Sequence, residues 1–258
     1  MCHPEAVDGR LALPAGADEV EIPVAEGVLP ALLVRPQGEP VGNVLIFHDV
    51  FGRTAFYEEL AARLAGAGYR AVLPDFFHHE GALEENTVEA AFQRRQRADS
   101  RRMLSEGLAA AGWIGDGIAT RLGVIGFCMG GNYALAMAAE RGDLATVCYY
   151  GFPGRPIHSI QEPGSPTPID LAAAMRGPIL GFWGEEDEGV GMENVARFAE
   201  AMRAYGRDFE HHVYPGAGHG FLRLSELKPG SPLYDVACDS WTRAVAFLRQ
   251  YVGEPIRA

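Results

Sequence analysis

The chain lacks the features that mark membrane, secreted and nucleic-acid-binding proteins. It has no stretch of about 18 apolar residues, so no membrane span is expected. Basic residues number 22 against 34 acidic ones, and the formal net charge of −12 would repel a phosphate backbone, which argues against nucleic acid as a partner. Residues 1–18 contain three acidic side chains and no apolar core, unlike a signal peptide. These absences predict a soluble, cytoplasmic protein.

Cysteine is also scarce, with four residues at positions 2, 128, 148 and 238. Their spacing matches no zinc-binding pattern, and a cytoplasmic chain would keep them reduced. The run His78-His79-Glu80 suggests a metal site, but adjacent histidines cannot easily both ligate from one regular element, and no third ligand is evident. We therefore expect no metal and no cofactor. A second pair, His211 and His212, falls on an expected strand, where neighbouring side chains point to opposite faces, and is interpreted as packing or surface.

What the chain has in quantity is alternation between short apolar runs and helical patterns. The expected strands cover residues 20–24, 29–35, 43–47, 70–74, 121–126, 146–150, 178–183 and 209–214. The expected helices cover residues 54–67, 86–111, 129–140, 192–205 and 238–251. With 48% hydrophobic residues, the chain can bury a sizeable core. This alternation predicts an α/β fold with a mostly parallel sheet and helices on both faces.

No linker or repeat interrupts the pattern, so residues 19–258 are expected to form a single domain behind a loose leader, residues 1–18. Residues 151–170 are too rich in proline for a helix or a central strand. Because they follow a strand directly, we expect them at the carboxyl edge of the sheet, where ligands bind in such folds. One long expected helix carries arginines that are interpreted as a solvated face, namely Arg94, Arg95, Arg97, Arg101 and Arg102.

The most informative stretch is Gly-Phe-Cys-Met-Gly-Gly at residues 126–131, between an apolar strand and an alanine-rich helix. A nucleophile held on a sharp strand-to-helix turn has this pattern, because side chains two residues away on either side would collide. The start of the following helix favours a negative charge, which lowers the pKa of a thiol from its usual value of about 8.5. No Gly-x-Ser-x-Gly motif competes for the role. The pattern therefore indicates Cys128 as a nucleophile.

The partners of such a nucleophile are an acid and then a histidine, each on a loop after a later strand. Residues 179–187 form an apolar run that ends in carboxylates and offers Asp187; one of the neighbouring Glu185, Glu186 and Glu188 stays open as an alternative. His219 follows the last expected strand. The order and the three successive loops favour a catalytic triad of Cys128, Asp187 and His219.

These motifs resemble the dienelactone hydrolase family of α/β-hydrolases. The similar stretches are residues 126–131, Trp-Gly-Glu-Glu-Asp (183–187), Gly-His-Gly-Phe (218–221), His-Asp-Val-Phe-Gly (48–52), residues 68–77 and Tyr-Tyr-Gly (149–151). The resemblance covers roughly residues 20 to 251. It implies the α/β-hydrolase fold and a Cys-His-Asp triad that opens cyclic enol-lactones and related small esters.

The resemblance also assigns roles near the nucleophile. It implies that Asp49 helps to deprotonate the thiol, although the family usually has the longer glutamate at this position. The backbone amides of Val50 and Met129 would form the oxyanion hole. His48, next to Asp49, remains either a hydrogen-bonding support or a core histidine.

Substrate contacts depart from the family pattern. The family holds a substrate carboxylate with two arginines, and Arg223 matches one, whereas the other position falls at His78-His79. Histidine does not replace a bidentate guanidinium. We expect Arg223, His79 and Tyr150 to line the substrate site.

Two rival functions stay open on the sequence alone. The first is a broad carboxylesterase acting on neutral esters, which the half-present arginine pair motivates. The second is a thiol-based sensor or binder without enzymatic activity, although a sensor would need neither Asp187 nor His219. The sequence leaves a monomer and a homodimer equally open.

Overall fold

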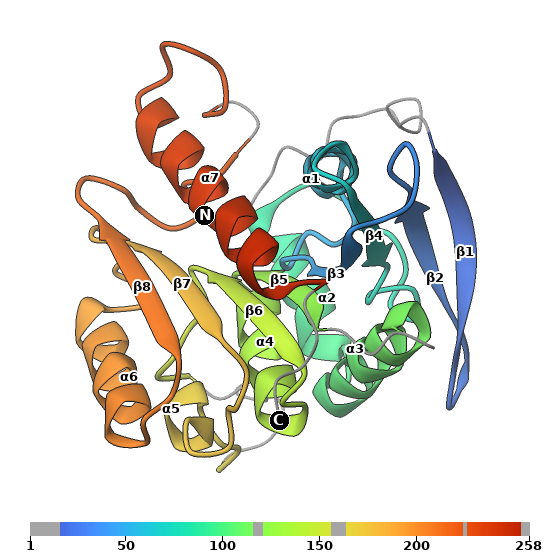
Figure 1. Ribbon diagram of the computed structural model, residues 1–258. Helices are drawn as coiled ribbons and strands as arrows, with labels where there is room; N and C mark the ends of the chain where they lie inside the picture. Colours follow the sequence, from blue (N-terminus) through green and yellow to red (C-terminus); the bar gives the residue numbers. More distant parts are fainter. Residues whose placement is uncertain (1–15, 116–120, 156–163, 224–225, 254–258) are drawn as a thin grey trace.

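A computed structural model describes residues 16–115, 121–155, 164–223 and 226–253. Its centre is one eight-stranded sheet (Figure 1). In chain order the strands are β1 (Ala17–Val24), β2 (Gly27–Val34), β3 (Gly42–Phe47), β4 (Tyr69–Pro74), β5 (Leu122–Phe127), β6 (Leu144–Tyr149), β7 (Ile179–Gly184) and β8 (Phe209–Tyr214). Their order across the sheet is β1-β2-β4-β3-β5-β6-β7-β8. The first two strands pair antiparallel and β2 pairs antiparallel with β4, whereas all other pairs are parallel, as predicted.

Helices connect the parallel strands and cover the sheet. They are α1 (Ala55–Gly66), α2 (Val88–Arg97), α3 (Ser100–Gly115), α4 (Met129–Glu140), α5 (Pro168–Leu171), α6 (Met192–Ala204) and α7 (Tyr234–Tyr251). Figure 1 shows α7 in front of the sheet and α4 and α6 behind it. Within the described part of the chain, no helix is both long enough and apolar enough to cross a bilayer.

Burial along each strand follows its place in the sheet. The central strands β3, β5, β6 and β7 are buried at every position, which agrees with their uninterrupted apolar sequences. The edge strand β8 has no fully buried position and carries the polar run Glu-His-His. The core therefore fixes the central parallel strands, whose carboxyl ends carry the candidate site.

The long helix expected over residues 86–111 is wrong in one respect, because it is two helices. Ala98 adopts an extended conformation with ψ of 138°, which ends α2. The carboxylate of Asp99 then accepts hydrogen bonds from the backbone amides of Arg101 (2.8 Å) and Arg102 (3.2 Å). An aspartate that satisfies first-turn amides starts a new helix. The Asp-Ser pair at residues 99–100 was the sequence signal for this break.

The break also corrects the interpretation of the arginines as one solvated face. Arg94 and Arg95 are only 5% and 4% exposed. Arg95 donates to the hydroxyl groups of Ser100 (2.5 Å) and Tyr133 (3.1 Å), so its buried charge has partners. Arg97 and Arg101 are exposed, as expected.

Two boundaries also shift. Ala17 and Asp18 belong to β1, so the expected leader is too long by at least these residues; residues 1–15 lie outside the described part. The proline-rich segment after β6 contains the single-turn helix α5, although a helix was not expected there. Proline at its first position, Pro168, has no amide to satisfy, and Thr167 caps the turn. Residues 156–163 of this segment also lie outside the description.

Candidate active site

Cys128 stands at the sharp turn between β5 and α4. Its backbone has φ of 55° and ψ of −119°, a conformation that costs a non-glycine residue about 1–3 kcal/mol. The amide of Cys128 donates to the carbonyl of Tyr149 at 3.0 Å, and its own carbonyl accepts from Gly131 at 3.0 Å. The turn is thus held from both sides, and α4 begins at the next residue, Met129.

The two flanking glycines have a steric reason. A Cβ at Gly126 would lie 2.1 Å from the carbonyl oxygen of Gly130, and a Cβ at Gly130 would lie 2.2 Å from the carbonyl oxygen of Phe47. Both collisions involve backbone atoms, which cannot rotate away. The Gly-x-Cys-x-Gly pattern is therefore a packing requirement of this turn, as the sequence suggested.

Asp187 and His219 meet as the sequence predicted. His219 donates from Nδ1 to the carboxylate Oδ2 of Asp187 over 2.6 Å. The carboxylate side chain is 1% exposed, and its other oxygen accepts from the backbone amide of Val190 at 3.1 Å. Asp187 follows β7 and His219 follows β8, so two successive loops bring them together. The alternative acids Glu185, Glu186 and Glu188 are exposed.

Aromatic rings enclose the histidine. The ring of Tyr150 packs edge-on against His219 with centroids 5.1 Å apart, and Phe152 stacks on it at 5.2 Å. Tyr150 is fully buried and has a positive φ of 40° at the point where the chain leaves β6. Its amide is held by the carbonyl of Phe182 at 2.7 Å. Tyr150 thus lies beside the candidate base, consistent with its expected place at the substrate site.

The loop after β3 carries Asp49 and Val50, both fully or almost fully buried. The carboxylate of Asp49 accepts from the amide of Phe51 at 2.9 Å, and its own amide donates to the hydroxyl oxygen of Tyr57 at 3.1 Å. Burial raises the pKa of Tyr57 well above its usual value, and the charges of Asp49, Tyr150 and Cys128 raise it further. Tyr57 therefore sits among the candidate catalytic groups, and sequence analysis missed it because it looked like one more apolar residue of α1.

His48 is both a core histidine and a hydrogen-bonding support, the two roles that the sequence left open. It is fully buried, and it donates from Nδ1 to the carbonyl of Asp49 (2.8 Å) while Nε2 accepts from the amide of Phe76 (3.1 Å). This arrangement fixes a neutral ring, and burial lowers its pKa to about 4. His48 joins the loop after β3 to the loop after β4.

Arg94 supports the same loop from α2. It donates to the carbonyl oxygens of Val50 (3.0 Å) and Gly81 (3.1 Å), and its guanidinium lies 4.1 Å over the ring of Phe77. Burial lowers its pKa to about 10. The buried arginine thus connects the expected oxyanion residue Val50 to residues 75–81.

Comparisons with known proteins identify the family of the chain. The family model described as "Dienelactone hydrolase family" matches residues 29–252. The chain belongs to the dienelactone hydrolase family. A carboxymethylenebutenolidase of Rhodococcus opacus is 36% identical over 211 residues, 81% of each chain. A probable 2-oxo-3-(5-oxofuran-2-ylidene)propanoate lactonase of Bradyrhizobium sp. is 30% identical over 202 residues, 77% of this chain and 76% of its own.

Solved structures support the fold. A Klebsiella pneumoniae protein assigned provisionally as a dienelactone hydrolase superposes with a TM-score of 0.81 and 28% identity, covering 91% of this chain and 98% of its own. The α/β-hydrolase fold expected from the sequence is confirmed. The expectation that the protein is a hydrolase of lactones or esters is confirmed as well.

The family's carboxylate-binding arginine pair has no simple counterpart here. Arg223 donates from Nε to the carbonyl of Gly220 at 2.7 Å and from its terminal nitrogen to the carbonyl of His219 at 3.5 Å. His79 lies with its Nε2 3.6 Å from Oε1 of Glu106, whose pKa burial raises to about 7. In its ionised form, Glu106 would oppose a carboxylate on a substrate. The other buried thiol, Cys148, is inert because burial raises its pKa to about 12.

Proposed function

We propose that the protein hydrolyses small lactones or activated carboxylic esters through a thioester on Cys128, with His219 as the base and Asp187 as its positioning carboxylate. The observation that carries this proposal is the 2.6 Å hydrogen bond between His219 and Asp187, at the same edge of the sheet as the turn of Cys128. Family membership supplies the class of reaction.

The hydrogen bond decides which nitrogen acts. Because a carboxylate only accepts, the proton of the neutral imidazole resides on Nδ1 and the lone pair on Nε2. His219 can then take the thiol proton and later return a proton to the leaving group. Asp187 stabilises the imidazolium that forms in between, as in other triads of this kind.

The acyl transfer proceeds in two balanced steps. The thiolate of Cys128 adds to the carbonyl carbon, and the amides of Met129 and Val50 receive the developing oxyanion. The carbon–oxygen bond of the ester then breaks, and the enolate or alkoxide leaves with a proton from His219. In the second step His219 deprotonates a water molecule that attacks the thioester. The carboxylic acid is released and the thiol is restored.

The carboxylate side chain of Asp49 is proposed to promote removal of the proton from the thiol of Cys128. Asp49 is fully buried; the amide of Phe51 holds its carboxylate, and the hydroxyl oxygen of Tyr57 holds its backbone amide. A carboxylate that kept its charge beside the sulfur would oppose the thiolate. Asp49 is therefore proposed to accept the thiol proton and pass it on to His219. Tyr57 is accordingly a positioning residue for Asp49.

The nucleophile narrows the substrate class. A thiolate is a good leaving group, so its adduct with an ordinary alkyl ester collapses back to the starting ester. Lactones and esters with stabilised leaving groups, such as enolates and phenolates, proceed to the thioester. We therefore propose activated substrates over fats or peptides.

A second candidate function is an esterase for neutral substrates. The geometry of Arg223, which donates to two backbone carbonyls, and of His79, which lies beside Glu106, favours it. Nε and one terminal nitrogen of Arg223 are directed at backbone carbonyls, and His79 has no guanidinium fork with which to bind a carboxylate.

The test is turnover of p-nitrophenyl acetate and of a carboxylate-bearing dienelactone, each with untreated and iodoacetamide-treated protein. We expect hydrolysis that alkylation and Cys128→Ala both abolish. Opening of the dienelactone favours the first function, and hydrolysis of only the neutral ester favours the second. Full activity of Cys128→Ala would refute the thioester mechanism, and inactivity on both substrates would favour the sensor.

A further inference from the structure

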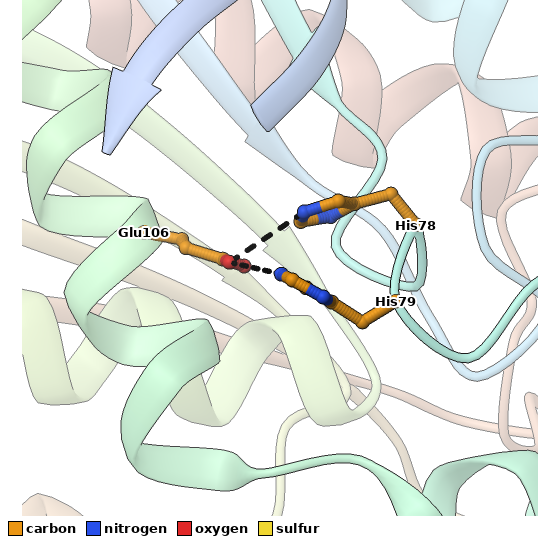
Figure 2. A group of neighbouring side chains, drawn as sticks. All are labelled: His78, His79 and Glu106. Carbon is orange, nitrogen blue, oxygen red and sulfur yellow. Dashed lines mark ion pairs between the residues drawn. The ribbon is translucent and has the colours of Figure 1, made fainter. Parts of the chain in front are cut away.

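A cluster of three potential metal ligands lies outside the catalytic groups. His78 and His79 are on the turn that follows β4, and Glu106 projects towards them from α3 (Figure 2). Their ligand atoms all lie within 4.8 Å of one another. Sequence analysis expected no metal because it found no third ligand. The missing ligand is Glu106, which is 27 residues further along the chain than His79 and reaches the turn only in the folded protein.

The orientation of His78 indicates what this cluster lacks. Its Nδ1 lies 2.9 Å from the carbonyl oxygen of Asp75. A carbonyl can only accept, so Nδ1 carries the proton and Nε2 of the neutral ring presents a lone pair. That nitrogen is buried without a hydrogen-bond partner and faces Oε1 of Glu106 at 3.8 Å. Two acceptors that face each other need a proton or a metal cation between them.

Glu106 is unsatisfied in the same way. Its side chain is 3% exposed, and neither carboxylate oxygen has a hydrogen-bond partner. A buried carboxylate normally accepts several hydrogen bonds or binds a cation, because leaving it without either is costly. Two buried groups that face each other without a hydrogen bond to either point to a ligand.

The distances suit a small metal ion. Oε1 of Glu106 is 3.8 Å from Nε2 of His78 and 3.6 Å from Nε2 of His79, too long for hydrogen bonds. Ligands about 2.0–2.1 Å from a tetrahedral Zn²⁺ lie about 3.4 Å apart. The two distances from Glu106 are therefore within a few tenths of an ångström of this value, and the ligand atoms of the two histidines lie within 4.8 Å of each other.

We propose that His78, His79 and Glu106 bind one divalent transition-metal ion of the Zn²⁺ class. Two imidazoles and one carboxylate are a common ligand set for zinc, with the fourth position left for water. His79 is one-third exposed, which gives the ion a path from solvent and leaves room for that water. The hydrogen bond from His78 to the carbonyl of Asp75 is the outer contact that orients a metal-binding histidine.

The neighbouring charged side chains do not neutralise the negative charge of the cluster. Arg102 lies 3.5 Å from Oε1 of Glu106, but its terminal nitrogen is engaged with Glu80 at 2.7 Å. With both histidines neutral and Glu106 ionised, as it would be when it binds a cation, the two glutamates and one arginine leave a net charge of −1. Removal of the arginine charge should tighten metal binding.

The ion would join α3 to the turn of residues 76–80. Arg94 connects Gly81, at the end of this turn, with the loop that carries Val50, and His48 connects Phe76 with the same loop. The metal would therefore stiffen the support of the active-site loop without touching Cys128. Its role is structural, and the proposal does not depend on the triad mechanism.

The test uses the full-length protein stripped of metal with EDTA and alkylated with iodoacetamide, so that accessible thiols are blocked. Titration calorimetry with Zn²⁺ should give one site per chain. His79→Ala and Glu106→Gln should each weaken the affinity by more than about 100-fold, beyond the 10–100-fold typical of an outer contact. Co²⁺ should bind with a visible spectrum that lacks a thiolate charge-transfer band.

The second histidine pair provides a matched control. His211 and His212 are also adjacent, and His212 lies 2.7 Å from Glu210. His212→Ala should leave the Zn²⁺ affinity unchanged, and Arg102→Met should raise it. Absence of a one-to-one site, or equal affinity in the wild type and His79→Ala, would overturn the proposal and leave a proton shared between His78 and Glu106. Because His79 is partly exposed, its variant should fold even where Glu106→Gln does not.

Discussion

Arg94 donates a 3.0 Å hydrogen bond to the carbonyl oxygen of Val50, the residue whose amide we assign to the oxyanion hole. The arginine comes from α2, and Val50 comes from the loop after β3. A peptide unit whose neighbouring carbonyl is held in this way cannot rotate freely, so the adjoining amide direction is fixed as well. The relationship makes Arg94 a positioning residue for the proposed chemistry.

Replacement of Arg94 by methionine should therefore lower kcat more than it raises KM. The buried carbonyl of Val50 would lose its donor, which costs about 1–3 kcal/mol, and a small displacement of the oxyanion amide can cost about 100-fold in rate. We expect kcat to fall by about 10-fold or more. The value is expressed per active site, counted as the thiols that react with iodoacetamide. Arg97→Met is the matched control, since Arg97 is exposed on the same helix. Equal kcat values for the two variants would contradict the positioning role.

Asp187→Asn should reduce kcat by about 10⁴-fold, as such a change does in other triads. The amide would present a donor to His219 and favour the tautomer with its proton on the wrong nitrogen. Steady-state hydrolysis of an activated ester measures this loss. Glu186→Gln, one residue earlier and exposed, should keep full activity. A larger effect at Glu186 would reassign the acid.

Glycines at two sites should respond oppositely to alanine. Gly126→Ala would place Cβ 2.1 Å from the carbonyl oxygen of Gly130 and should destabilise the fold by more than about 3 kcal/mol. Gly112 lies exposed within α3 with nothing within 4 Å of an added Cβ, and alanine there should stabilise by about 0.5–1 kcal/mol. Urea unfolding of both variants and of the wild type measures the two changes in the free energy of unfolding. A stable Gly126→Ala protein would show that the turn is looser than described.

His48 should make stability depend on pH. Its pKa is about 4 in the folded protein against 6.5 ordinarily, because burial disfavours the charged ring. The unfolded chain therefore binds the proton more readily, and the stabilisation present above pH 6.5 is lost as the pH falls towards 4. Between pH 7 and pH 5 the loss should be about 2 kcal/mol. Urea unfolding should give a smaller loss for His48→Asn, which does not titrate; identical pH profiles would argue against a neutral buried ring.

Arg223→Ala should affect charged and neutral esters alike. The guanidinium donates to the carbonyls of Gly220 and His219, so its removal loosens the loop of the proposed base whatever the substrate. The measurement is kcat/KM on a carboxylate-bearing ester and on its neutral analogue. A selective loss of about 10-fold or more on the charged ester would instead mean that Arg223 binds the substrate carboxylate.

The sequence by itself determined the layout of the sheet and the order of the candidate triad. Both depend on local chemistry, since a buried parallel strand must be apolar throughout and the turn at Cys128 tolerates only glycine at Gly126 and Gly130. These constraints act between residues close in the chain, so they can be recognised in the amino-acid sequence. The helix break at Ala98 was visible only in part, because Asp99 caps helices but is also a common surface residue.

Only the tertiary structure decided which polar residues meet across the chain. Arg94 looks like a surface arginine until Val50 and Gly81 supply its acceptors, and Tyr57 looks like a core residue until its hydroxyl meets the amide of Asp49. Glu106 is an unremarkable helix residue until α3 packs over the turn with His78 and His79. The stabilisation of a buried charge depends on partners that may be dozens of residues away, and no periodicity in the sequence encodes such a pairing.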